Sequence, residues 1–183
     1  MLEFKPRLTP YEMIEAGVFG GAYFSPNAGP VVKSEIDFKL FEGLDKNLYE
    51  KDKYSPKLNK FKTRSGLNFE QWTGYNWFHK DDPYGWFEWY CKYYSGRRHE
   101  DDNRQIKRWQ DISGPNGRWR KRIYGMIHET GNWNSSPRIQ QTLLHWSYMV
   151  NELDYTFWCK QNNKVAPEEW CEYGGLPSPS FYE

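Results

Sequence analysis

The sequence predicts a single compact, mainly α-helical domain with an aromatic-rich core. At least five segments carry helix caps or apolar residues at helical spacing, whereas runs that alternate apolar and polar residues are scarce. Aromatic residues make up 19% of the 183 residues and all hydrophobic residues only 38%, so rings must fill much of the interior. This length suits one domain. We expect the domain to span residues 1–172, and residues 173–183, which lack periodicity, to form a flexible tail.

The first helix is predicted to begin at Thr9, with Pro10 at its first position and Glu12 completing a capping box. Gly17 is the predicted stop. The segment GVFGGAYF follows at residues 17–24, and its apolar residues should lie inside. Its paired glycines would let two backbones, or a backbone and a ligand, approach closely. If the chain contains a short strand, we expect it in this segment.

A lysine-rich stretch over about residues 45–64 lacks apolar periodicity, so we expect an exposed basic loop. A solvated connection is the simpler interpretation of this loop. A second strip that contacts phosphates is the alternative.

A second helix is predicted to have Asp82 as its N-cap and Pro83 at its first position, and to end at Gly96. Aromatic residues occupy most of its sides, which is typical of a helix at the centre of a fold. A base-stacking platform is the less favoured interpretation of these rings. The next helix should begin at Asp101 or Asp102 and run to about Ile112.

Two further helices are predicted after the break SGPNG at residues 113–117. One begins at Arg118, and the other has Ser136 as its cap and Pro137 at its first position. Six residues of the predicted helices are expected to be buried together: Trp86, Trp89, Tyr90, Trp109, Leu143 and Trp146.

Positive charge is concentrated between Arg97 and Arg122. This segment holds nine Lys or Arg residues against four acids, although the whole chain has a formal charge of only +1. A basic patch of this kind is typical of nucleic-acid-binding surfaces. The first turn of the helix after residues 113–117 is basic as well, and a helix N-terminus favours anions.

The segment over about residues 101–131 resembles the helix-hairpin-helix element of DNA-binding proteins and DNA glycosylases. That element usually carries two glycines separated by one residue, whereas Gly114 and Gly117 are separated by two, as in KH domains. The strands of a KH domain are not predicted. No aspartate lies between Asp111 and Asp154, so the catalytic aspartate of such glycosylases has no counterpart. Two antiparallel helices with a solvated basic face are the simpler alternative.

The predicted nucleic-acid interface is an edge formed by basic side chains and hairpin backbone, with Arg118, Arg120 and Lys121 as its phosphate contacts. The full set of predicted contacts is Arg97, Arg98, Arg104, Lys107, Arg108, Gly114, Asn116, Gly117, Arg118, Arg120 and Lys121.

The motifs GVFGGAYF, HKDDPYGWFEWYCKYYSGRR, DDNRQIKRW, GPNGRW and RIQQTLLHW also resemble a family of proteins met in large DNA viruses, phages and microbial genomes. The resemblance covers most of the chain from Leu8 to Trp146. It implies a viral or microbial context and no particular activity.

Catalytic residues are not identified by spacing; the candidates are His79, Asp82, His128 and Glu129, of which the first two suit a capping cluster. No metal site and no cofactor are predicted. The three cysteines lack CxxC spacing, and neither a signal peptide nor a run of about 20 apolar residues is present, so we expect an intracellular protein of the cytoplasm or nucleus that is not secreted and has no membrane partner.

The leading functional hypothesis is a nucleic-acid-binding protein, with DNA favoured over RNA as the partner and a role in DNA processing or base modification. An enzyme that acts on a non-nucleic substrate through Asp and His clusters is the first alternative. A virion or assembly component that binds other proteins is the second. The oligomeric state is not predicted.

Overall fold

Helices supply the regular secondary structure of the computed structural model, which describes residues 3–25, 27, 34–66 and 79–166. Within these ranges the chain forms six α-helices and three 3-10 helices and has no strand, apart from one isolated bridge between His79 and Asp82. The mainly α-helical fold class is therefore confirmed. The α-helices are α1 (Pro10–Glu15), α3 (Trp86–Tyr94), α4 (Asp102–Ile112), α5 (Arg118–Thr130), α6 (Pro137–Leu144) and α7 (Glu152–Gln161); the 3-10 helices are η1 (Phe38–Phe41), η2 (Lys46–Leu48) and η3 (Pro56–Leu58).

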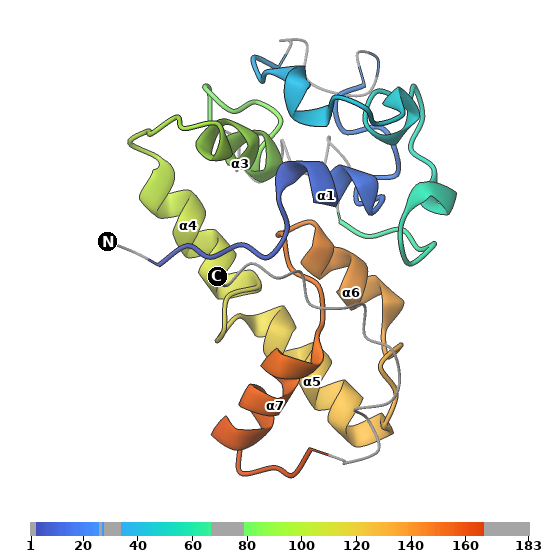
Figure 1. The fold of residues 1–183 in the computed structure, drawn as a ribbon, viewed down its shortest axis with the longest axis vertical. Coiled ribbons are helices and arrows are strands. Elements are labelled where there is room, and N and C mark those ends of the chain that lie inside the picture. The colour runs from blue at the N-terminus through green and yellow to red at the C-terminus, as the bar shows by residue number, and fades with distance from the viewer. Residues whose placement is uncertain (1–2, 26, 28–33, 67–78, 167–183) are drawn as a thin grey trace.

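The helices divide into two groups along the long axis of the molecule (Figure 1). Helices α1 and α3 pack together at one end, where α1 also contacts η1. Helix α5 contacts both α6 and α7 at the other end. Helix α4 runs along one side and packs against the start of the next helix, so the α4–α5 pair joins the two ends.

The N-terminal capping box is present as predicted. Thr9 Oγ1 accepts a hydrogen bond of 3.2 Å from the Glu12 N–H, and Glu12 Oε2 accepts one of 2.7 Å from the Thr9 N–H. Helix α1 ends at Glu15, and Gly17 follows with φ +72°. A Cβ at Gly17 would lie 2.0 Å from the Leu58 carbonyl oxygen, so the chain needs glycine there.

The GVFGGAYF segment forms turns rather than a strand. Its Gly20 N–H donates to Asn59 Oδ1 at 2.7 Å, and its Gly21 carbonyl accepts from the Lys51 N–H at 2.8 Å. A Cβ at Gly20 would lie 2.5 Å from the Tyr54 ring. These contacts explain the glycines by close approach to the lysine-rich stretch.

Residues 45–64, the predicted exposed basic loop, contain ordered turns. They contain η2 and η3, and Tyr49 and Asn59 are buried among them. This stretch lacks the apolar periodicity of a long helix. Short 3-10 turns and hydrogen bonds between side chains and backbone hold the stretch in place instead. Several of its lysines remain exposed.

The predicted starts of α3 and α6 are wrong in part. Helix α3 begins at Trp86 after Gly85, whose φ is +87°, and Asp82 does not cap it. Helix α6 does begin at Pro137, but Ser136 has a φ of +45° and its side chain makes no capping hydrogen bond. Helix α7 was not predicted.

The core consists of two clusters of buried residues. The larger one surrounds α3 and includes Trp86, Trp89, Tyr90, Trp109 and Trp146. The smaller one lies between α5, α6 and α7 and includes Leu143. All six residues expected to be buried are buried, but Leu143 belongs to the second cluster and not to the first.

The predicted tail, residues 173–183, and the last residues of the predicted domain, 167–172, lie outside the described residues. No helix among those described is both long enough and apolar enough to cross a bilayer.

Candidate functional site

Helices α4 and α5 are joined by a short turn at residues 113–117, but the glycine amides of this turn are already used. The Gly114 N–H donates to the Trp109 carbonyl at 3.0 Å, and the Gly117 N–H donates to the Gly114 carbonyl at 2.8 Å. The predicted role of these two amides as phosphate donors therefore conflicts with their observed hydrogen bonds. Asn116 is exposed on the same turn.

Close packing of backbone explains both glycines of the turn between α4 and α5. A Cβ at Gly114 would lie 2.8 Å from the Gln110 carbonyl oxygen, and one at Gly117 would lie 2.5 Å from the Ile112 carbonyl carbon. Backbone atoms cannot rotate away as side chains do. The glycines let α5 begin directly against the last turn of α4.

Replacing Gly117 with alanine is expected to lower the free energy of unfolding by about 1–3 kcal/mol, because the turn must open to admit the methyl group. Gly125 provides a matched control on α5, since a Cβ there would meet nothing within 4 Å. Gly125→Ala should raise stability by about 0.5–1 kcal/mol. Urea unfolding of both variants measures the difference. A neutral Gly117→Ala would contradict the packing role.

Four of the predicted phosphate contacts are paired with acids of the chain itself. Arg97 donates two hydrogen bonds, of 2.8 and 2.6 Å, to the Asp82 carboxylate. Arg104 donates two, of 2.5 and 2.7 Å, to the Asp101 carboxylate. Lys107 pairs with Asp111, one turn further along α4. Arg120 pairs with Asp154 of α7.

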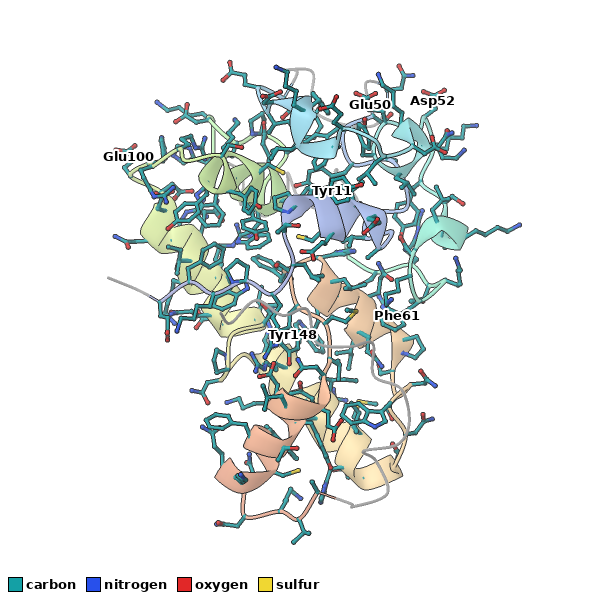
Figure 2. All side chains as sticks on the ribbon, in the orientation of Figure 1. Tyr11, Glu50, Asp52, Phe61, Glu100 and Tyr148 are labelled. Atoms are coloured by element: carbon teal, nitrogen blue, oxygen red, sulfur yellow. The ribbon has the colours of Figure 1, made fainter. Side chains whose placement is uncertain are left out.

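Arg120 differs most from its prediction, because it is buried. Its side chain is 9% exposed, its guanidinium lies 2.8 Å from Asp154 Oδ1, and it stacks over the Tyr148 ring at 4.3 Å. Tyr148 is fully buried and lies near the middle of the view in Figure 2. Successive residues of a helix point in directions about 100° apart, so Arg120 cannot share the outer face of Arg118 and Lys121.

Arg108 is half-buried between α4 and the segment after α6. Its guanidinium lies 5.3 Å from the centre of the Trp146 ring and donates to Gln105 Oε1 at 2.9 Å. Burial, together with the charge of Arg104, lowers the pKa of Arg108 to about 10. Arg98 is exposed and stacks over the Tyr93 ring at 3.9 Å.

Three basic residues share one exposed face of α5: Arg118, Lys121 and Arg122. They stand at i, i+3 and i+4, the spacing that places side chains next to one another on a helix. None of the three forms an ion pair with a described residue. The sequence-based list of contacts omitted Arg122, although this spacing would have indicated it.

The N-terminal end of α5 adds to this charge. Gly117 is the N-cap and no side chain caps the helix, whose first turn carries no acidic residue. The helix has 13 residues, so its backbone dipoles place partial positive charge at this end. We call the face formed by Arg118, Lys121 and Arg122, with this helix end, the α5 basic face.

The four catalytic candidates fall at two separate places. His79 and Asp82 lie on the turn before α3, and Asp82 is fully buried. His128 lies near the end of α5, where its Nδ1 is 2.9 Å from the Tyr155 hydroxyl, and Glu129 is exposed beside it. The structure does not bring these pairs together as one site.

Comparisons with models of protein families, with curated proteins and with solved structures found no match to the chain. Functional inference therefore depends on the residues and their arrangement.

Proposed function

We propose that the protein binds nucleic acid, DNA in preference to RNA, by contacting backbone phosphates with the α5 basic face. The observation that carries this proposal is the set of three exposed cations, Arg118, Lys121 and Arg122, without acidic partners among the described residues. Unpaired arginine and lysine side chains can replace the counterions that surround a phosphate backbone. The adjacent helix end favours the same anion.

The two ion pairs on α4 differ in their exposure to solvent. Arg104 donates two hydrogen bonds to Asp101, whose side chain is only 6% exposed. The side chains of Lys107 and Asp111 are both 58% exposed, so this second pair faces solvent. Exposed pairs of this kind contribute little to stability. Phosphate oxygens can therefore compete for Lys107, whereas Arg104 stays with Asp101 and the buried Arg120 stays with Asp154.

The proposed contacts are to phosphates and not to base edges, so binding should depend strongly on salt and only weakly on sequence. This mode suits a protein that acts along DNA in processing or base modification, in the viral or microbial setting that the sequence motifs suggest. An enzyme on another substrate and an assembly protein remain the competing functions, and neither requires this salt dependence.

The test compares wild type with an Arg118→Ala, Lys121→Ala, Arg122→Ala variant by fluorescence anisotropy on labelled duplex DNA, single-stranded DNA and duplex RNA. Each lost phosphate contact should reduce the slope of log K against log salt by about 0.9 on duplex DNA, so the triple variant should lose about 2.7. Affinity should fall by a similar factor for every sequence.

A Lys53→Ala, Lys57→Ala, Lys62→Ala variant is the matched control, because it removes the same charge from exposed positions of the lysine-rich stretch. It should retain the wild-type slope. Equal reductions of the salt slope in both variants would mean that binding depends on net charge or on the lysine-rich stretch. Absence of binding by wild type at low salt would reject the proposal. Arg120 is left intact because its removal would disturb the fold.

A further inference from the structure

The turns on either side of α3 bring two histidines and one aspartate together. His79 and Asp81 precede the helix, and His99 follows it. Figure 2 labels Glu100, next to His99, at the edge of the molecule on the turn between α3 and α4. We propose that His79, Asp81 and His99 form a binding site for a divalent transition metal of the zinc class.

The three ligand atoms lie close together. His79 Nδ1 lies 3.4 Å from Asp81 Oδ2, and His99 Nε2 lies 3.1 Å from the same oxygen. All three ligand atoms lie within 4.8 Å of one another. Ligands at about 2.0–2.1 Å from a tetrahedral zinc ion are separated by about 3.3 Å. The two short distances therefore match two edges of a metal-centred tetrahedron.

The turn that carries His79 and Asp81 is held in place by buried charges. The Asp82 N–H donates to the His79 carbonyl at 3.0 Å, and Lys92 Nζ donates to the Asp81 carbonyl at 2.6 Å. Asp82 is itself fixed by Arg97 and by Lys92. Such support from surrounding groups is what a metal site needs to hold its ligands ready.

The turn that carries His99 is equally constrained. Its N–H donates to Asp102 Oδ2 at 2.9 Å, and its carbonyl accepts from the Asp102 N–H at 3.1 Å. The Asp101 N–H donates to His99 Nδ1 at 3.2 Å, so the ring carries its proton on Nε2, toward Asp81. Metal binding at Nε2 moves this proton to Nδ1 and gives up the Asp101 contact.

The charges around the site leave Asp81 available to a cation. The neighbouring carboxylates of Asp82 and Asp101 are paired with arginine side chains. Among the described residues the Asp81 carboxylate contacts only the two imidazoles, and it pairs with no arginine or lysine side chain. All three side chains are partly exposed, so an ion can reach them.

Two imidazole nitrogens and one carboxylate oxygen favour zinc and similar first-row metals over magnesium or calcium, which prefer all-oxygen sites. Three protein ligands would leave a position for water, as in catalytic zinc sites. The sequence did not indicate this set, because His99 lies 18 residues after Asp81 and only the return of the chain around α3 brings them together. The inference is independent of the α5 basic face.

The experiment measures zinc binding by equilibrium dialysis with metal analysis, after a chelator has removed bound metals. The protein carries Cys171→Ser, so that this thiol cannot bind the metal. Cobalt absorption then reports the ligand type, because nitrogen and oxygen ligands give visible bands without thiolate charge transfer. We expect one zinc per chain, a rise in melting temperature with zinc, and no effect of magnesium.

Asp81→Asn and His99→Asn should each weaken zinc binding at least tenfold, since even groups that only support metal ligands change affinity by about 10–100-fold. Asparagine at position 99 retains an acceptor for the Asp101 N–H, which helps this variant to fold. Asp111→Asn and His128→Asn are the matched controls and should bind as wild type does. No zinc bound at micromolar concentration, or unchanged affinity in the Asp81 and His99 variants, would overturn the proposal.

Discussion

Trp89→Ala is expected to lower the free energy of unfolding by about 3–5 kcal/mol, a large share of the stability of a typical domain. Trp89 is fully buried in the larger cluster, where its ring lies 5.5 Å from that of Phe4 and 5.0 Å from that of Tyr93. Its Nε1 also donates to Asp102 Oδ1 at 2.8 Å. Alanine would leave a cavity and remove the donor that ties α3 to the first turn of α4.

Urea unfolding followed by circular dichroism measures this loss. Trp89→Phe separates the two contributions, because it retains a buried ring and removes the indole N–H, and it should fall between wild type and Trp89→Ala. Tyr94→Ala on the same helix is the surface control, since that ring is 52% exposed. An alanine variant with the wild-type midpoint would show that the ring at position 89 is not a core residue.

Local signals in the sequence were enough to predict the helix starts that depend only on neighbouring residues. The capping box at Thr9 and the proline at the start of α6 each act within a few residues. Burial of Trp86, Trp89 and Trp109 also followed from helical spacing. These features do not depend on how distant segments meet.

Features that depend on distant partners could not be read from the sequence. Asp82 before Pro83 has the pattern of a helix cap, but the return of the chain after α3 places Arg97 against it, and the buried pair overrides the local pattern. The positive charge of the predicted interface was overestimated for the same reason. Four of its basic residues meet acids, and two of those acids, Asp82 and Asp154, lie outside the segment that the charge count covered.

Helix α7 escaped prediction because its apolar residues do not form a single stripe. Leu153 and Phe157 are exposed, whereas Tyr155 and Trp158 are buried. A helix with apolar residues on several sides gives no clear periodicity. Its buried residues pack in the smaller cluster with those of α5, and Asp154 adds an ion pair with Arg120 of α5.

Asp154→Asn is expected to cost about 3–5 kcal/mol, because it leaves the buried Arg120 and the partly buried Arg7 without their anion. Asp154 Oδ1 lies 2.7 Å from Arg7 and 2.8 Å from Arg120, and Oδ2 accepts from the Tyr148 hydroxyl at 2.9 Å. These side chains are 9–17% exposed, so water cannot replace the lost charge. The carboxylate ties the N-terminal segment, α5 and α7 together.

Asp111→Asn is the matched control, because it removes a carboxylate from an ion pair whose side chains are both 58% exposed. Its cost should stay below about 1 kcal/mol. A small effect of Asp154→Asn, similar to that of the control, would mean that Arg7 and Arg120 find other partners or solvent. Denaturation at pH 7 compares the two variants with wild type.

The pH dependence of stability provides a second measure of the Asp154 network. Burial alone would raise the pKa of the Asp154 carboxyl, but the charge of Arg120, a hydrogen bond from Asn151 and the charge of Arg7 lower it below its ordinary value. A group whose pKa is lower in the folded state stabilises the fold above its unfolded pKa, which is about 3.9 for aspartate. This contribution should therefore be constant from about pH 6 to 8 and be lost as pH falls through the folded pKa. The difference in unfolding free energy between wild type and Asp154→Asn should shrink below about pH 4, and a difference that stays constant down to pH 2 would contradict the assignment of this stabilisation to the ionised carboxylate.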